Sequence, residues 1–407
     1  MTFITLIYFL FQVYISYRKK GWDISAYIFL LYATTSFFAC CIVYLNPDSE
    51  FSRVETGLLP TLVYCSLITL TILPLRRINL KRPFQITKKG VKLFEYISYF
   101  YIGMFFLMLI LFATNIYTIL VNGDFYYMRI AGDASALASV NPLLRTILIA
   151  FGELSSLMLF FFFYSISYLD NSWKFNLLLF LSSLSMVLLG IMNIDRSRSF
   201  YWIIIFGLAL TIYLPHLSRK AKRIAILMFG MTGVMVLAYF IIVSISRFSQ
   251  GDSNVQNSLL SYAGQPYLQF CDFYNTYKPA KINFHFFFPN IYHFFIDGYS
   301  TAVDIGTAIE DKTGRFVNVF YTMLGSIMLD SGKLSMLLFV FLYVCIFGVF
   351  TKRIRICKVI SFWSVMQVFL LSLIPACGII SYYISSPIMA LGFYALIGLS
   401  IRGNRLR

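Results

Sequence analysis

Runs of about 20 apolar residues recur from one end of this 407-residue chain to the other. A helix of that length spans roughly 30 Å, which is the thickness of the hydrocarbon core of a bilayer. Only 12% of the residues are charged, whereas a water-soluble domain carries roughly a quarter. A transmembrane β-barrel would instead show short segments that alternate between apolar and polar residues. The sequence therefore predicts an all-α, polytopic integral membrane protein.

The apolar runs define about 11 expected membrane spans, and two of them are short for a full crossing. The first run lacks a basic segment before it and a small-residue cleavage site, so we expect a retained span rather than a signal peptide. No repeat, low-complexity tract or separate soluble segment divides the chain, and we expect one membrane domain over residues 1–407. The runs are 2–17, 24–45, 57–75, 93–121, 146–169, 177–193, 200–214, 224–245, 334–350, 359–379 and 387–401.

The basic residues assign the two sides of the chain. If the N-terminus lies outside, the segments that face the cytoplasm hold 22 of the 33 lysines and arginines, and only three acids, Asp23, Glu95 and Asp170, lie in or near them. Cytoplasmic loops are enriched in Lys and Arg, so this bias predicts an outside N-terminus and a cytoplasmic C-terminus. The formal net charge of +16 then reflects topology and gives no support to nucleic-acid binding. The expected cytoplasmic segments are 18–20, 76–92, 170–176, 215–223, 351–358 and 402–407.

The longest connection lies on the expected outer face, where a large loop covers residues 246–333. Two shorter outer segments cover residues 122–145 and 194–199. Loops on a rigid scaffold commonly carry the binding and catalytic groups. Residues 284–295 of the large loop are rich in Phe and Tyr and too short to span. We expect them to lie in the membrane interface, where amphipathic aromatic residues are favoured.

Two arginines stand at an outer boundary, against the charge bias of that side. Arg196 and Arg198 lie between the sixth and seventh apolar runs. Guanidinium groups bind phosphate oxygens through paired N–H donors and keep their charge, so this pair can bracket a diphosphate. Alternatively, the two side chains can extend to lipid headgroups or pair with Asp195. Arg247 follows the eighth run at the same expected depth, either as a third phosphate ligand or as an interfacial anchor.

Three residues of the large loop are candidate proton acceptors. His285 and His293 are the two outer histidines, and both lie in the aromatic stretch 284–295. Histidine is a common general base near neutral pH, but either residue can instead donate to a backbone carbonyl. Asp330 stands just before the ninth run and is the other candidate, unless it serves as the N-cap of the helix expected from Leu334.

Aromatic and amide side chains are mixed in residues 262–270, which include Tyr262, Gln265 and Tyr267. Sugar rings stack on aromatic faces while their hydroxyls bond to amides, but a structured turn would use the same residues. Glu153 is the one acid deep within a span. Intramembrane acids are functional candidates by default, although hydroxyls of neighbouring helices can also hold such an acid.

Motifs for metals and nucleotides are absent from the sequence. There is no Asp-x-Asp pair, no GxxxxGK[ST] or GxGxxG motif, and no metal-ligand spacing among the seven cysteines. We therefore expect neither a metal nor a cofactor, and nucleotide use at the inner face is unsupported.

The order of these features resembles the bacterial O-antigen and capsular repeat-unit polymerases of the Wzy type, which are distantly similar to O-antigen ligases. The matching stretches are 195–198 after a span, 246–247 at the start of the large loop, 262–267 within that loop and 324–332 before the next span. The resemblance covers most of the chain as architecture. It implies a GT-C-like membrane fold with interfacial helices in the outer loop.

The resemblance implies a metal-independent glycosyltransferase of the bacterial plasma (inner) membrane. Such an enzyme would join undecaprenyl-diphosphate-linked oligosaccharide repeat units on the outer face, to form O-antigen, capsule or exopolysaccharide. Its partners would be the lipid-linked glycans, the bilayer and a chain-length regulator protein, without nucleic acid. The expected catalytic residues are Arg196, Arg198, Arg247, His293 and Asp330, and the expected substrate-binding residues are Asp195, Tyr262, Gln265, Tyr267, Asn275 and His285.

Other functions stay open at this point. A lipid-linked oligosaccharide flippase would show internal repeats, helices broken at the midplane and several intramembrane ionisable groups. The sequence contains one such group, Glu153, and has a long outer loop. A membrane acyltransferase would favour catalytic residues near the cytoplasmic side, where His216 is the only histidine. A purely structural membrane protein would not need arginine clusters on its outer face.

Overall fold

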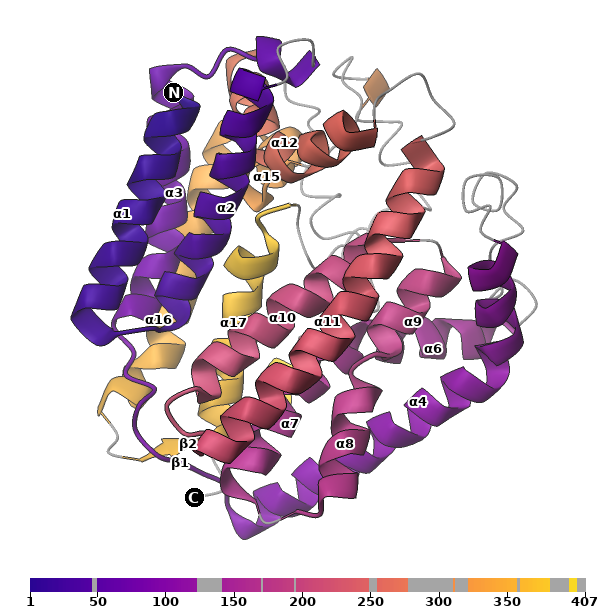
Figure 1. The fold of residues 1–407 in the computed structure, drawn as a ribbon. Helices are drawn as coiled ribbons and strands as arrows, with labels where there is room; N and C mark the ends of the chain where they lie inside the picture. Colours follow the sequence, from indigo (N-terminus) through magenta and orange to yellow (C-terminus); the bar gives the residue numbers. More distant parts are fainter. Residues whose placement is uncertain are drawn as a thin grey trace. The chain divides into compact units, whose positions relative to one another are not determined.

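The chain folds into helices that form two compact units in the computed structural model (Figure 1). Unit 1 comprises residues 1–79, 256–357 and 370–390, and unit 2 comprises residues 80–255, 358–369 and 391–407. The sequence predicts a single membrane domain, whereas the contacts within the structure divide the chain into these two units. The structure describes residues 1–45, 50–122, 141–169, 171–193, 195–248, 255–276, 310–311, 321–356, 359–380 and 395–400.

Seven helices of the described residues are long and apolar enough to cross a membrane. This confirms the prediction of a helical, multi-pass membrane protein, whereas the count of 11 spans stays a prediction. Two further apolar helices are shorter, Ser197–Tyr213 and Phe362–Cys377. The seven are Ile24–Leu45, Leu58–Arg76, Gly90–Ala113, Ile147–Tyr168, Trp173–Met192, Arg219–Val243 and Lys333–Lys352.

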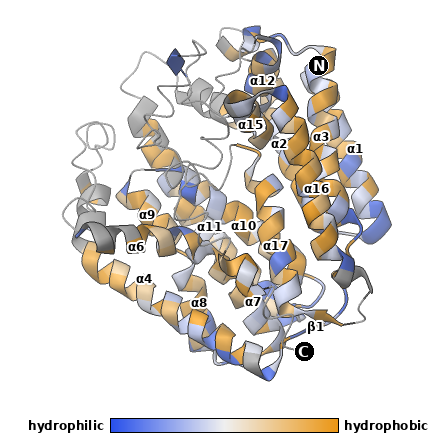
Figure 2. Cartoon of the chain, turned by 180° about the vertical axis from the view of Figure 1, so that it is seen from behind, coloured by the Kyte–Doolittle hydropathy of each residue, from blue (hydrophilic) through white to orange (hydrophobic). Residues whose placement is uncertain are grey.

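Helix α1 (Thr2–Lys20) is not among the seven, because polar side chains and a basic end lower its hydropathy. Four of its five buried residues are nevertheless polar, namely Thr2, Thr5, Gln12 and Ser16, and the fifth is Phe9. Its apolar residues Phe3, Ile7 and Phe11 are about half exposed. A helix that buries most of the small polar side chains of its apolar part and exposes large apolar ones is suited to a lipid environment rather than to water. Hydrophobic residues cover the helices along most of their length in Figure 2, and hydrophilic residues gather near the end of α1.

Unit 1 contains a bundle in which α1 packs along α2 and α3 packs along α16. A buried aromatic group holds the bundle together, with rings at centroid separations of 5.0–6.3 Å. Rings in this range contribute beyond the area that they bury. The unit's helices are α1, α2 (Ile24–Leu45), α3 (Leu58–Arg76), α12 (Val255–Thr276), α15 (Met323–Ser331) and α16 (Lys333–Ile356). The aromatic group is Phe9, Phe29, Tyr32, Tyr64, Tyr267 and Phe270.

Glycine permits a very close contact between two helices of unit 1. A Cβ atom at Gly264 of α12 would lie 2.5 Å from the backbone N of Ala39 and from the carbonyl carbon of Phe38, both in α2. No side chain fits at that separation, so only glycine lets the two backbones approach this closely.

Unit 2 contains the helices from α4 to α11 and the beginning of α17 (Phe362–Cys377), in which the boundary between the units falls after Phe369. Phe362 is fully buried and contacts Phe94, Phe160 and Tyr164 at centroid separations of 5.8, 5.3 and 4.4 Å. Its helices are α4 (Lys88–Asn122), α6 (Pro142–Leu154), α7 (Met158–Tyr168), α8 (Trp173–Ser182), α9 (Ser185–Met192), α10 (Ser197–Tyr213) and α11 (Arg219–Phe248).

A short parallel strand pair accompanies these helices, in which β1 (Phe84–Gln85) pairs with β2 (Ile360–Ser361). Phe84 stands opposite Ile360 in the register. β1 lies within the expected cytoplasmic segment 76–92, and β2 lies just after the expected cytoplasmic segment 351–358. This pairing ties two distant parts of the sequence together at the ends of their helices.

Two of the expected spans are interrupted rather than continuous. The run 146–169 becomes α6, a 3₁₀ turn η3 (Ser155–Leu157) and α7, and the run 177–193 becomes α8 and α9. A serine joins the two breaks, because the backbone N–H of Met186 donates to Ser155 Oγ over 3.0 Å and Ser155 Oγ donates to the carbonyl of Gly152 over 2.7 Å. Backbone groups freed from helix hydrogen bonds thus find a side-chain partner inside the apolar bundle.

Candidate anion-binding site

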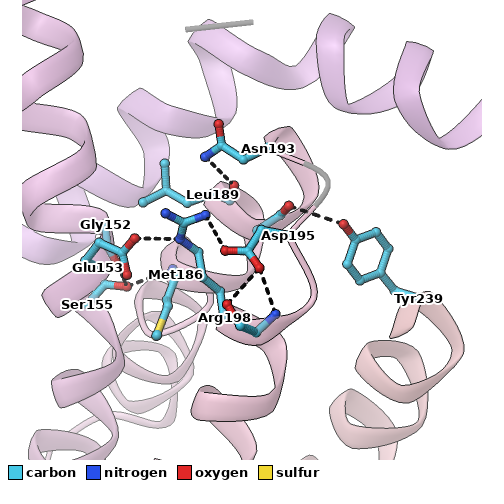
Figure 3. A network of polar contacts seen from close by, with 11 residues as sticks. Gly152, Glu153, Ser155, Met186, Leu189, Asn193, Asp195, Arg198 and Tyr239 are labelled. Carbon is cyan, nitrogen blue, oxygen red and sulfur yellow. Dashed lines mark hydrogen bonds and ion pairs between the residues drawn. The ribbon is translucent and has the colours of Figure 1, made fainter. Parts of the chain in front are cut away.

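The strongest polar cluster of unit 2 is built around Arg198, in the first turn of α10 (Figure 3). Its Nε donates to Glu153 Oε1 of α6 over 2.5 Å, and its Nη1 donates to Asp195 Oδ2 over 2.9 Å. The Glu153 side chain is 9% exposed and the Arg198 side chain 19%. Both carboxylates therefore hold one guanidinium from two different directions, in a largely buried setting where charge pairing is required.

The connection from α9 to α10 fixes the position of Asp195. Asp195 Oδ1 accepts the backbone N–H of Ser197 over 2.9 Å and its hydroxyl over 2.7 Å. The backbone N–H of Asp195 donates to the carbonyl of Gly190 over 2.8 Å, and Tyr239 of α11 donates to the same carbonyl over 3.2 Å. Asp195 lies between α9 and α10, and its backbone shares the Gly190 carbonyl of α9 with Tyr239 of α11.

Gly190 is needed for this connection to be so tight. A Cβ atom at Gly190 would lie 2.8 Å from the carbonyl oxygen of Asp195 and 3.2 Å from Cβ of Arg198. The absence of a side chain lets the chain fold back so that Arg198 reaches Glu153.

Hydroxyl groups extend the polar cluster from Glu153 into the bundle. Ser155 contacts the carbonyls of Gly152 and Ser183, and Trp202 Nε1 of α10 donates to Ser183 Oγ over 3.1 Å. These bonds join α6, α8, α9 and α10 around the acid, so the cluster has a rigid polar frame.

Hydrogen-bonding capacity is left over at the start of α10. Among the described residues, Arg198 Nη2 has no hydrogen-bond partner, and neither has the Ser199 hydroxyl, which is buried. Arg196 directly precedes α10 and is 6% exposed. Two N–H groups of a guanidinium and a hydroxyl thus lie within one helical turn, and such groups can bind the oxygens of an anion.

The printed ion pairs join two carboxylates, Glu153 and Asp195, to one guanidinium, that of Arg198. Arg196, which directly precedes α10, brings a second positive charge to this connection. The pairing of Arg198 with Asp195, one of the alternatives predicted from the sequence, is confirmed. Glu153 is held by Arg198 rather than by serine or tyrosine hydroxyls, because an acid in an apolar span is best compensated by a cation. Anion binding here would therefore depend on directed N–H donors more than on excess charge.

Several predicted site residues fall where the structure gives only a backbone position or none. Arg247 lies in the last turn of α11, Tyr262 in α12 and Asp330 in α15, and their side chains lie outside the described residues. His285 and His293 lie outside the described residues altogether. Their roles stay predictions.

The interpretation of Asp330 as the N-cap of the following helix is wrong. Asp330 lies inside α15, which ends at Ser331, and α16 begins at Lys333. Gly332 separates the two helices with φ of 92°, a left-handed conformation that glycine adopts without strain. Asp330 therefore cannot cap α16.

The stretch 262–270 is helical instead of forming a turn. It lies within α12, where Pro266 is accommodated in the helix. Tyr267 is fully buried, and its hydroxyl shares a 2.8 Å hydrogen bond with Thr61 Oγ1 of α3. Gln265 is also buried, whereas Asn275 is exposed and donates to the carbonyl of Glu55 over 2.9 Å. Tyr267 and Gln265 are thus part of the interior of unit 1 in this structure.

His216 is engaged in packing near the expected cytoplasmic side. Its Nε2 lies 2.6 Å from the carbonyl of Leu80, and its ring lies 4.4 Å from that of Phe84. Burial lowers the pKa of His216, while the contact with the Leu80 carbonyl acts in the opposite direction. A histidine with these contacts is accounted for by the fold, which gives the acyltransferase interpretation no added support.

No cluster of three or more His, Cys, Asp or Glu residues able to hold a metal ion occurs in the part of the chain that the structure describes. The sequence predicted Arg198 and Glu153 as separate candidates and missed their contact. The contact could have been predicted from the sequence, because a lone acid in a span requires a cation and Arg198 stands at a span boundary. No protein-family model, curated protein or solved structure matches the chain.

Proposed function

We propose that the protein is a membrane glycosyltransferase that polymerises undecaprenyl-diphosphate-linked oligosaccharide repeat units. The observation that carries this proposal is the Arg198 cluster, in which a guanidinium at the boundary of an apolar span is oriented by Glu153 and Asp195 and keeps Nη2 without a partner among the described residues. Oriented N–H donors at a membrane boundary suit the diphosphate of a lipid carrier, whose phosphates lie at that depth.

In the proposed reaction, a hydroxyl oxygen of the incoming repeat unit attacks the anomeric carbon of the growing glycan. The bond between that carbon and the diphosphate oxygen breaks, and undecaprenyl diphosphate leaves with the electron pair. Arg196, Arg198 and Arg247 would stabilise the charge that develops on the departing diphosphate. The hydroxyl proton would pass to His293, His285 or Asp330, the three candidate bases. The donor is already activated, so this reaction needs no nucleotide.

The placement of this reaction follows from the charge distribution. The distribution of the basic segments supports a position of the α9–α10 connection at the outer face of the plasma membrane, with the C-terminus in the cytoplasm. The lipid-linked glycan and the bilayer are then the partners, and a chain-length regulator protein is a further one that the resemblance to polymerases suggests.

A flippase for lipid-linked oligosaccharides is the second candidate, and one observation favours it. Transporters often break their helices beside an intramembrane charged group. The span Ile147–Tyr168 is interrupted by η3 two residues after Glu153, and the span Trp173–Met192 is interrupted between α8 and α9. This feature is weaker support, because the Arg198 cluster has a boundary position suited to a carrier's diphosphate.

Reconstitution into liposomes with a lipid-linked repeat unit separates the two functions. A ladder of products separated by one repeat unit supports the polymerase, whereas transbilayer movement without chain growth supports the flippase. Arg196→Ala and Arg198→Ala should each abolish the ladder, and Lys352→Ala, a basic residue of the opposite expected side, is the matched control. Unchanged polymer length and amount in both arginine variants would exclude the diphosphate assignment.

A further inference from the structure

Glu153 is a buried acid whose carboxylate accepts a hydrogen bond from one atom of a guanidinium, Nε of Arg198. It is 7% exposed, lies within the span Ile147–Tyr168 and reaches Arg198 from a different helix. The proposed chemistry uses the arginines directly, and Glu153 itself contacts neither the substrate nor the reacting atoms in it. A charged acid in an apolar span is costly unless it is paired, so an acid at this position requires an explanation.

The two carboxylates determine which atoms of the guanidinium stay available. A guanidinium is planar and carries five N–H donors in a fixed fork. Glu153 engages Nε and Asp195 engages Nη1, which leaves the two N–H groups of Nη2 (Figure 3). Because the two acceptors come from α6 and from the α9–α10 connection, they fix the plane of the guanidinium and not only its position.

The first turn of α10 supplies a second observation. The hydroxyl of Ser199 is 1% exposed and has no hydrogen-bond partner among the described residues. A buried hydroxyl without a partner is costly, and it costs less when a ligand oxygen can accept from it. Ser199 follows Arg198 in α10, so a second donor without a partner among the described residues lies in the same helical turn.

We infer that Glu153 is a positioning residue that orients Arg198 so that Nη2 is presented to a phosphate group of the lipid-linked substrate. This inference rests on the proposed function for the identity of the ligand, a polyprenyl diphosphate. Glu153 acts through its hydrogen bond to Nε, and its negative charge is not itself useful to an anion. If Glu153 acts by orienting Arg198, its replacement by alanine should weaken diphosphate binding. If only its negative charge matters, the same replacement should strengthen binding.

The test measures binding of farnesyl diphosphate to the full-length protein in lipid nanodiscs, for the wild type and two variants. Glu153→Gln keeps an oxygen that can accept from Nε, so its affinity should equal or exceed that of the wild type. Glu153→Ala removes the acceptor, and its affinity should fall about tenfold, as expected for loss of a charge-assisted hydrogen bond. Farnesol, which lacks the diphosphate, should bind equally weakly to all three proteins.

Gln12→Ala is the matched control. Gln12 Oε1 accepts a 2.5 Å hydrogen bond from Arg76 Nη2, so this variant also removes the side-chain acceptor of a partly buried arginine, in unit 1 instead of unit 2. Its affinity for farnesyl diphosphate should stay at the wild-type value. Thermal melting of each variant in the same nanodiscs verifies that the proteins compared are folded.

Three outcomes would overturn the inference. If charge alone governs binding, Glu153→Ala and Glu153→Gln will both bind more tightly than the wild type. If Glu153 has only a structural role, the melting temperature will fall in Glu153→Ala while the affinity of the folded fraction stays unchanged. Absence of diphosphate binding by the wild type would remove both the positioning role and the proposed function.

The polymerisation assay keeps the inference separate from the proposed function. If the wild type binds farnesyl diphosphate and the variants follow the expected order, but no lipid-linked glycan is extended, the positioning role stands and the polymerase proposal fails. If the wild type forms polymer and Glu153→Ala does so with an unchanged KM for the donor and an unchanged kcat, the polymerase proposal stands and the positioning role fails.

Discussion

Two arginines of the molecule, Arg76 in unit 1 and Arg198 in unit 2, meet their hydrogen-bonding needs in different ways. Arg76 Nη2 donates to Gln12 Oε1, its Nε donates to Ser16 Oγ over 3.2 Å, and its guanidinium carbon lies 4.7 Å from the centre of the Phe29 ring. Arg198 donates to two carboxylates. The direct hydrogen-bond partners of Arg76 are thus neutral groups, whereas those of Arg198 are two carboxylates.

The difference indicates that a buried arginine can contribute either through its positive charge or through the fixed direction of its N–H donors. Arg76 stands at the basic end of α3, which the sequence predicts to face the cytoplasm because Lys and Arg are enriched on that side. Arg198 contributes little net charge, so its value lies in the fixed direction of its remaining N–H donors. The predictions that follow separate these two uses.

The largest effect is expected for Arg198→Ala. This change leaves Glu153 as an unpaired acid in an apolar setting, and loss of one partner of a buried pair costs about 3–5 kcal/mol. Denaturation of the purified protein in mixed micelles measures the free energy of unfolding. The double variant with Glu153→Ala should recover much of the loss, because no unpaired charge is left.

Arg76→Ala is the comparison for Arg198→Ala. It leaves only neutral acceptors without their donor, so its cost should be clearly smaller than that of Arg198→Ala. Equal losses of unfolding free energy in the two variants would contradict the distinction between charge-compensated and neutral surroundings.

The second largest effect is expected for Gly264→Ala, which tests whether unit 1 depends on close packing rather than on charge pairs. The added Cβ would meet the backbone of α2 at 2.5 Å, and overpacking of this kind costs about 1–3 kcal/mol. Gly348→Ala in α16 is the control, because a Cβ atom there has no neighbour within 4 Å. A melting temperature that is the same in both variants would show that α12 and α2 can move apart without cost.

A smaller effect is expected for Gln12→Ala. Loss of its acceptor from the partly buried Arg76 should cost about 1–2 kcal/mol of unfolding free energy, because a hydrogen bond to a charged group is removed while Ser16 and the Phe29 ring still contact Arg76. Denaturation in mixed micelles again gives the value. A cost as large as that of Arg198→Ala would erase the difference between the two arginines.

The smallest effect is expected for the tyrosine hydroxyls of unit 1. Tyr267→Phe removes a buried hydrogen bond to Thr61 and should cost about 1 kcal/mol. Tyr64→Phe should be neutral or slightly stabilising, because the buried Tyr64 hydroxyl has no partner among the described residues. Thermal melting of the two single variants measures this difference, and a larger loss in Tyr64→Phe would show that its hydroxyl has a partner after all.

The sequence predicts the helices of this fold well where hydropathy and helix length coincide. The run 24–45 corresponds to α2 (Ile24–Leu45), and the run 57–75 to α3 (Leu58–Arg76). Helix α11 begins at Arg219, five residues before its apolar run, since Lys and Arg favour helices although they end a hydrophobic segment. Charge therefore marks the membrane boundary of a span better than it marks the end of the helix.

Hydropathy could not predict the interruptions at η3 and between α8 and α9. Serine residues that accept or donate to backbone groups are as compatible with a continuous helix as with a broken one. The helix α12 was also hidden, because the proline at position 266 favours a turn when only local sequence is considered.

The candidate site could be predicted only as separate residues. Arg198 and Asp195 are neighbours in sequence, and their pairing was one of the alternatives predicted. The contact between Arg198 and Glu153 joins residues 45 positions apart, and it depends on how α6 packs against α9 and how Gly190 folds the chain back. Information of this kind lies in tertiary packing and has no local signature.

The order of Glu153 and Arg198 along the chain has a consequence for membrane insertion. Synthesis adds about 5–20 residues per second, so Glu153 emerges from the ribosome roughly 2–9 s before the arginine that pairs with it. An unpaired acid opposes insertion of its helix by about 2.5–3.5 kcal/mol. The span Ile147–Tyr168 therefore enters the bilayer as an incomplete element, and arrival of α10 completes it. The order of the two charges therefore determines the order of assembly in unit 2, because the fifth expected span gains the partner of its acid only when the seventh has been synthesised.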